Sequence, residues 1–99
     1  MRVRWTEPAF RGWEETFAYI EADNPTAARR IAGKVLDAVE MLTRFPFAGR
    51  VGLAPDTREF AVSGSFFLII YAVEESNSVL KIIAVYDGRR QWPEYFQPQ

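Results

Sequence analysis

The chain has 99 residues, of which 48% are hydrophobic and 25% are charged, a composition typical of a folded globular protein. A chain of this length predicts one domain over residues 1–99. Cysteine and histidine are both absent, which excludes disulfides, thiol nucleophiles, zinc clusters built on these ligands and imidazole acid–base catalysis. The net charge is −1 at pH 7, so no overall field draws the chain onto nucleic acid, and sequence-specific nucleic-acid binding is not expected.

No apolar run in the sequence is long enough to span a membrane, so a membrane partner is not expected. The first residues also lack the apolar core of a signal peptide. Together with the absence of cysteine, these features favour a cytoplasmic location.

The first half of the chain predicts a short strand followed by two helices. Residues 2–5 alternate polar and apolar side chains, which indicates a strand. Over residues 7–22 apolar side chains recur every three or four positions, which predicts a helix with Thr6 as its N-cap. A second helix is expected over residues 25–44, with Asn24 as its cap. Because so short a segment joins the two helices, they should form an antiparallel hairpin.

The second half predicts a loop, three strands and an irregular end. Residues 44–56 contain two glycines and two prolines and are expected to form a loop. Strands are expected over residues 57–62, 66–73 and 79–86, and the second of them should be covered on much of both faces because it is apolar without interruption. Residues 87–99 are expected to be irregular or weakly helical. The fold class is therefore α+β in the order β-α-α-β-β-β, a helical hairpin packed on a mostly antiparallel sheet of about four strands.

Aromatic residues make up 15% of the chain, and most of them fall on the predicted apolar faces. Core packing therefore explains them better than a stacking platform for a ligand. The side chains expected to be mostly buried are Phe10, Trp13, Phe17, Ile31, Val35, Leu42, Leu68, Ile70 and Ile83.

A first pair of arginines flanks the end of the predicted loop and is a candidate binding site. The guanidinium groups of Arg50 and Arg58 could together hold phosphates or the carboxylates of a partner. The alternative is that Arg58 pairs with a local acid, Glu59 or Asp56, while Arg50 is solvated.

A second pair of arginines follows the last predicted strand, where Arg89 and Arg90 stand between Tyr86 and Trp92. Paired arginines beside aromatic rings suit contact with nucleic acid or an acidic peptide through forked hydrogen bonds and stacking. The alternative is a solvated loop in which Trp92 closes the edge of the core. The sequence has no Gly-rich phosphate loop and no metal-binding pattern, so neither a cofactor nor a metal is expected.

Several segments, read in order, resemble the RelE/ParE superfamily of toxins from type II toxin–antitoxin pairs. They are Trp5-Thr6-Glu7-Pro8-Ala9, NPTAARR at 24–30, Leu42, FPFAGR at 45–50, TREFAV at 57–62, Tyr71 and VYDGRRQWP at 85–93. Their order and spacing cover nearly the full chain. The resemblance implies a helical hairpin over an antiparallel sheet in which the first strand lies beside the last. It also implies a cognate antitoxin as partner, in a pair of the plasmid-stabilisation type.

Two activities compete within this superfamily. RelE-like members cut mRNA on the ribosome without a metal, using Arg and Lys to stabilise the phosphorane, whereas ParE-like members poison DNA gyrase. The resemblance places Leu68 where RelE-like toxins carry a catalytic Arg, and the near-neutral net charge disfavours contact with rRNA. The ParE-like interpretation therefore predicts a gyrase inhibitor without catalytic residues. The alternatives are a ribosome-dependent mRNA endonuclease and an inactive relative that only binds an antitoxin.

The residues expected to bind the target share a position on loops at the ends of the sheet: Arg58, Arg89, Arg90 and Trp92. Arg50 and Tyr86 are further candidates for contact with a phosphate or an acidic group. Asp87 stands where many ParE-like toxins carry His, and its charge would repel a phosphate unless Arg89 or Arg90 neutralises it.

Overall fold

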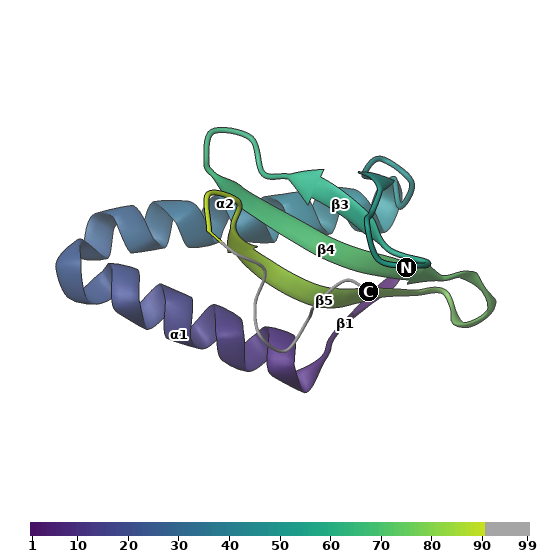
Figure 1. The fold of residues 1–99 in the computed structure, drawn as a ribbon, viewed down its shortest axis with the longest axis horizontal. Helices are drawn as coiled ribbons and strands as arrows, with labels where there is room; N and C mark the ends of the chain where they lie inside the picture. The colour runs from purple at the N-terminus through teal and green to yellow at the C-terminus, as the bar shows by residue number, and fades with distance from the viewer. Residues whose placement is uncertain (91–99) are drawn as a thin grey trace.

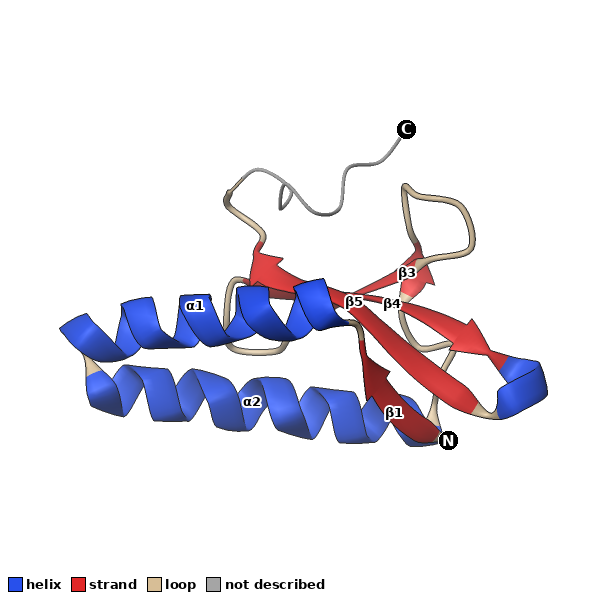
Figure 2. Ribbon diagram, turned by 90° about the horizontal axis from the view of Figure 1, so that it is seen from below, coloured by secondary structure: helices blue, strands red, loops and turns tan. Residues whose placement is uncertain are grey.

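The computed structural model describes residues 1–90 and places them in two layers, a five-stranded sheet and a pair of helices on one of its faces (Figures 1 and 2). The elements are, in chain order, β1 (Arg2–Trp5), α1 (Glu7–Asp23), α2 (Pro25–Arg44), β2 (Arg50–Val51), β3 (Arg58–Ala61), β4 (Phe67–Glu74), a 3-10 helix (Glu75–Asn77) and β5 (Val79–Asp87). The strand order is β1-β5-β4-β3-β2, with β1 parallel to β5 and the remaining pairs antiparallel. The α+β class, the helical hairpin and the position of the first strand beside the last are thereby confirmed.

The residues before each helix explain where the helices begin. The side chain of Thr6 accepts a hydrogen bond from the backbone N–H of Ala9 at 3.2 Å, and that of Asn24 accepts one from Ala27 at 3.0 Å. Each cap is followed within two positions by a proline, where the missing N–H costs no helical bond. The N–H of Asn24 also donates to the carbonyl of Ile20 at 2.7 Å. One residue therefore ends α1 and begins α2, which folds the two helices back as a hairpin. Among residues 1–90, neither helix combines the length and the apolar character that a membrane crossing would need.

The core lies between the helical hairpin and the strands β4 and β5. Val35 and Leu42 of α2 meet Ile69 and Tyr71 of β4 there, and all four are fully buried. The neighbouring Ile70 lies outside this cluster, yet its exposed fraction is also 0%. β4 is therefore buried on both faces, as its uninterrupted apolar sequence predicts.

The expected burial of several apolar side chains is wrong or only partly met. Phe10 is 50% exposed and packs edge-on against Trp5, with ring centroids 6.4 Å apart. Five others are half-buried: Trp13, Phe17, Ile31, Leu68 and Ile83. Periodicity identifies the inward stripe of a helix but not how much sheet lies beneath it, and among the strands α1 packs mainly against β5. For Ile83 the cause is a register shift, because Ile70 pairs with Ala84 and Tyr71 with Ile82, which leaves Ile83 as the extra residue.

The predicted loop over residues 44–56 contains a short strand, so the expected order with about four strands is corrected to one with five. β2 pairs with β3, with Arg50 opposite Glu59 and Val51 opposite Arg58. A strand of two residues is too short to show the alternation by which strands are recognised in a sequence.

The hydroxyl of Tyr71 ties the segment before β2 to the sheet. It accepts a hydrogen bond from the N–H of Gly49 at 2.9 Å and donates to the carbonyl of Pro46 at 2.8 Å. A Cβ at Gly49 would lie 2.6 Å from this hydroxyl oxygen, so a side chain there would force the two apart. Burial raises the pKa of Tyr71 above its ordinary value, which keeps the hydroxyl protonated and able to donate.

Truncation of Ile70 tests the burial of β4 on both faces. Ile70→Ala should lower the free energy of unfolding by about 2–5 kcal/mol, because the cavity cannot be filled from water. Leu36→Ala on α2 removes a side chain that is 56% exposed and should cost less than about 1 kcal/mol. Urea unfolding followed by circular dichroism measures both, and equal losses would show that the face of Ile70 is open.

Candidate functional site

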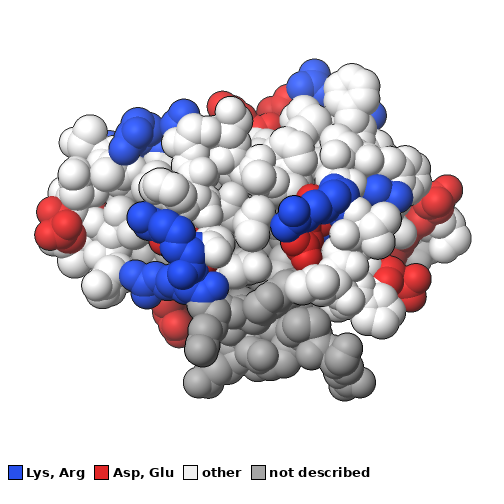
Figure 3. Space-filling view, turned by 45° about the horizontal axis from the view of Figure 1, so that its top comes forward, with Lys and Arg blue, Asp and Glu red and all other residues white. Residues whose placement is uncertain are grey.

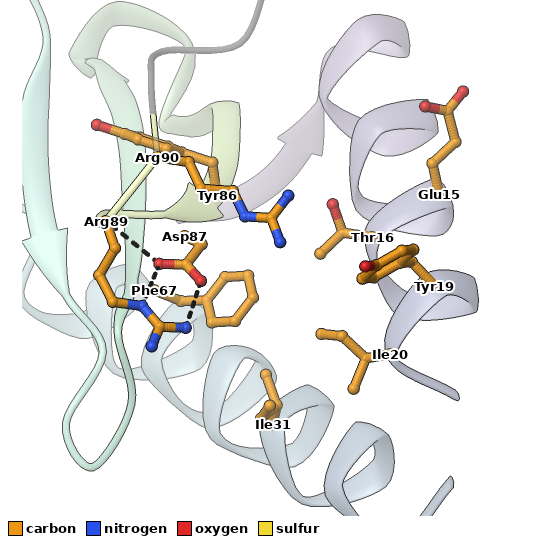
Figure 4. A pocket seen from close by; sticks show the side chains of 10 residues that line it. All are labelled: Glu15, Thr16, Tyr19, Ile20, Ile31, Phe67, Tyr86, Asp87, Arg89 and Arg90. Atoms are coloured by element: carbon orange, nitrogen blue, oxygen red, sulfur yellow. Dashed lines mark hydrogen bonds and ion pairs between the residues drawn. The ribbon is translucent and has the colours of Figure 1, made fainter. Parts of the chain in front are cut away.

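A pocket of about 400 Å³ opens between the helical hairpin and the end of β5 (Figure 4). Its lining comes from α1, α2, β4, β5 and the turn after β5: Glu15, Thr16, Tyr19, Ile20, Ile31, Phe67, Tyr86, Asp87, Arg89 and Arg90. Apolar side chains form one side of the pocket, and the guanidinium groups stand at the other (Figure 4). A concave apolar surface with a few polar groups is the usual form of a ligand or side-chain binding site.

Asp87 and Arg89 form a closed ion pair beside this pocket. The Arg89 guanidinium donates from Nε to Oδ1 of Asp87 at 3.0 Å and from a terminal nitrogen to Oδ2 at 2.7 Å. The backbone N–H of Arg89 donates to the same Oδ1 at 2.9 Å. These side-chain hydrogen bonds, followed by the backbone one, hold the pKa of Asp87 below its ordinary value. The guanidinium also lies 3.9 Å from the centre of the Phe66 ring. Arg89 therefore compensates the charge of Asp87, which is the condition under which this carboxylate would not repel a phosphate.

The turn that carries the two arginines is fixed to the start of β4. The N–H of Gly88 donates to the carbonyl of Phe66 at 2.7 Å, and the N–H of Arg90 donates to the carbonyl of Asp87 at 3.0 Å. A Cβ at Gly88 would meet the Leu68 side chain at 3.0 Å and the Phe66 carbonyl oxygen at 3.1 Å. Glycine therefore permits the close approach that holds this turn in place.

Arg90 differs from Arg89 in its surroundings. Within residues 1–90, no ion pair involves Arg90. Its guanidinium reaches across the pocket toward Tyr19 and lies 5.9 Å from the centre of that ring, which is itself 71% exposed (Figure 4). Of the two arginines in this turn, Arg90 thus carries the positive charge that remains available to a ligand.

Arg50 is held by a buried carboxylate. It donates to Oε1 of Glu59 at 2.9 and 3.3 Å, while Oε2 accepts the N–H of Leu53 at 3.2 Å. Glu59 is only 6% exposed, so its charge must be compensated where it lies. The Arg50 side chain is itself 73% exposed, so the alternative interpretation is right that Arg50 is solvated, but Arg50 also has a carboxylate partner that this interpretation did not foresee. Burial, followed by the charge of Glu59, raises the pKa of Tyr86, which keeps its phenol neutral at physiological pH.

Arg58 binds the backbone, so the alternative interpretation, in which it pairs with Glu59 or Asp56, is wrong. It donates to the carbonyl of Gly49 at 2.8 Å and lies 4.9 Å from the centre of the Phe47 ring. Along β4, Arg58 stands opposite Tyr71 while Asp87 stands opposite Phe67.

The structure does not unite the four candidate arginines into one site. Four residue steps along β4, about 13 Å at the rise of a strand, separate the position opposite Arg58 from the position opposite Asp87, where the turn that carries Arg89 and Arg90 begins. Figure 3 correspondingly shows the cations in separate groups on the face that it presents. Trp92 lies outside the described residues. Among residues 1–90, no cluster of three acidic side chains is placed to hold a metal ion.

The pocket contains residues that sequence reasoning missed. Thr16, Tyr19 and Ile31 belong to the helices and meet the turn after β5 only in the folded chain. One signal was available for Tyr19, a large aromatic residue directly beside the apolar stripe of its helix. Nothing in the sequence indicates that this aromatic ring faces Arg90.

Comparison with known proteins identifies the class of this fold and then the family. The structure superimposes on the chromosomal ParDE system of P. aeruginosa with a TM-score of 0.74 at 18% identity, covering 88% of this chain and 95% of that one. The isolated RelE toxin of E. coli gives 0.59 at 17% identity, covering 91% and 86%. The E. coli RelBE toxin–antitoxin complex gives 0.59 at 18%, covering 90% and 98%. At these identities the likeness establishes the fold shared by RelE and ParE toxins.

The sequence itself settles the family. Residues 3–92 match the family described as "ParE toxin of type II toxin-antitoxin system, parDE", and the chain belongs to that family, within the RelE/ParE superfamily. It is also 36% identical over 93 residues to the protein Y4kP of Sinorhizobium fredii, with 94% of each chain covered.

The pH dependence of stability tests the Asp87–Arg89 pair. Because the folded-state pKa of Asp87 is lowered, the pair stabilises the fold above the ordinary value of 3.8 and loses its effect as the pH falls through the lower folded-state value. Asp87→Asn should therefore be less stable than wild type at pH 7, and the difference should shrink toward zero below pH 3.8. Urea unfolding across this range measures it, with Asp37→Asn on the exposed side of α2 as control. A difference that does not change with pH would contradict the ion pair.

Proposed function

We propose that this ParE-family toxin acts on DNA gyrase and is neutralised by a cognate antitoxin. The observation that carries the proposal is the turn after β5, which presents Arg90 beside an apolar pocket while Asp87 holds Arg89 in place. This arrangement has the features of a protein-binding site, with an exposed Arg and Tyr beside a preformed hollow.

The residue pair next to Phe67 and Asp87 on the same two strands supports gyrase over ribosomal mRNA as the target. Leu68 pairs with Tyr86 at the position where the RelE-like resemblance expects a cation. The nearby Arg50 has its charge compensated by Glu59, and the raised pKa of Tyr86 disfavours a phenolate base. Stabilising a phosphoryl transition state requires cations whose charge is aimed at the reacting phosphate. Arg50 and Tyr86 are poorly suited to that task.

The surface around β2 supports an antitoxin as a partner. Four large apolar side chains are more than half exposed there: Phe45, Phe47, Val51 and Leu53. β2 is the edge strand of the sheet, and Arg58 lies against the ring of Phe47. An amphipathic antitoxin segment could place apolar anchors on this surface and acidic groups near Arg58. Tight neutralisation would be consistent with a buried area of about 1,600 Å² or more.

A gyrase supercoiling assay tests the proposed target. The double variant Arg89→Ala/Arg90→Ala should raise the half-inhibitory toxin concentration by at least about 30-fold, the loss typical of an interface hot spot. Arg29→Ala/Arg30→Ala removes two adjacent exposed arginines from α2 and should leave inhibition unchanged.

The same proteins are then incubated with programmed ribosomes. Cleavage of ribosome-bound mRNA should be undetectable for wild type and both variants. Efficient cleavage by the wild-type protein would favour the nuclease alternative. Full gyrase inhibition by the Arg89→Ala/Arg90→Ala variant would show that these arginines face solvent and do not contact gyrase.

A further inference from the structure

We infer that the pocket beside Arg90 binds an apolar side chain that stands next to a carboxylate on the target protein. The toxin would therefore engage a protein segment of its target rather than DNA phosphates. The identity of the target rests on the proposed function, whereas the chemistry of the pocket can be tested without gyrase.

The apolar side of the pocket is built to accept a bulky group. Ile20, Ile31 and Phe67 line it, and the edge-on contact of Trp13 with Phe67, at 6.0 Å between ring centroids, fixes that ring from behind. An aromatic or branched aliphatic side chain would displace water from these surfaces. A phosphate group has no apolar part to place there.

The charge of the pocket suits one carboxylate and not a polyanion. Asp87 cancels the charge of Arg89 through two side-chain hydrogen bonds, so Arg90 supplies the remaining positive charge. Glu15 also lines the pocket, but its side chain points away from Arg90 (Figure 4). Affinity for DNA comes from several cations that neutralise several phosphates at once. One compensated and one available arginine do not form such a surface.

The donor group is also held ready for a planar acceptor. The backbone hydrogen bonds of Gly88 and Arg90 fix the turn, and the Arg90 guanidinium lies 5.9 Å from the centre of the Tyr19 ring. An arginine positioned in this way can donate two parallel hydrogen bonds to a carboxylate. Fixing the backbone of the turn before binding reduces the entropy lost on association.

Arg89 has a different role, which is to position Arg90. The Asp87 carboxylate is close enough to Arg90 for the two charges to interact, so it would compete for Arg90 if Arg89 were absent. By occupying both oxygens of Asp87, Arg89 leaves Arg90 available to a ligand. We therefore treat Arg89 as a positioning residue and Arg90 as the residue that contacts the ligand.

Nuclear magnetic resonance titration with three small probes tests the pocket on the purified protein. The probes are 3-phenylpropanoate, its neutral analogue 3-phenylpropan-1-ol, and inorganic phosphate. The carboxylate should cause saturable shifts at Thr16, Tyr19 and Arg90 and bind about tenfold more tightly than the alcohol, as expected for one charge-assisted contact. Phosphate should cause no saturable shift there. Arg90→Gln should reduce carboxylate binding to the level of the alcohol, and Arg30→Gln should not change it.

A rescue experiment separates positioning from mere structural support. Arg89→Ala should weaken carboxylate binding because Asp87 then pairs with Arg90. Adding Asp87→Asn in the same chain removes that competitor and should restore binding, although both partners of the original ion pair are gone. Failure of this rescue would refute the positioning role. Absence of saturable carboxylate shifts, or phosphate binding of equal strength at the same residues, would refute the pocket assignment.

Binding to gyrase without DNA distinguishes failure of the pocket from failure of the proposed target. Wild type should bind gyrase in the absence of DNA, and Thr16→Trp, which fills the pocket, should reduce this binding at least tenfold while unfolding as wild type does. Binding that requires DNA would refute the inference. If the probes bind but gyrase is neither bound nor inhibited, the proposed target is wrong and the pocket assignment stands.

Discussion

The pairing of β4 with β5 is the constraint on which the rest of this structure depends. Both strands are apolar and largely buried, so their backbone groups must bond to each other because water cannot reach them. The register that results runs from Phe67 opposite Asp87 to Glu74 opposite Val79. It supports the helical hairpin on one face, and it fixes what stands at each end of the strands. At the end of β5, this register places Asp87 beside the helical hairpin.

The neutral pairing of Asp87 with Arg89 turns this position into a selective site. Asp87 lies beside two arginines and could pair with either of them. It pairs with Arg89, which donates two side-chain hydrogen bonds and one backbone hydrogen bond to the carboxylate. The remaining arginine faces an aromatic ring and an apolar hollow. A pocket of this kind discriminates by shape and by a single charge, which fits a toxin with a net charge of only −1 better than binding to a nucleic acid backbone does.

Local signals predicted the helices well, whereas pairing across the fold could not be predicted. Thr6 and Asn24 cap their helices because capping depends only on neighbouring residues. Glu59 is adjacent to Arg58 in sequence, but successive strand residues face opposite sides, so it pairs with Arg50 across the β2–β3 register. The arginines after β5 could be proposed as binding residues from the sequence alone, because they stand beside aromatic residues. Tyr19 could not, since its place beside them depends on how α1 packs against β5.

Site-specific photocrosslinking tests most directly whether the pocket contacts the target protein. A benzoylphenylalanine replaces Tyr19 at the pocket and, in a control protein, the exposed Leu36 of α2. Each is irradiated with gyrase and DNA, and the adducts are mapped by mass spectrometry. A protein-binding pocket predicts an adduct from position 19 to one gyrase peptide in which an acidic residue adjoins a bulky apolar one, with little adduct from position 36. Adducts to DNA from position 19, or equal and scattered adducts from both positions, would contradict it.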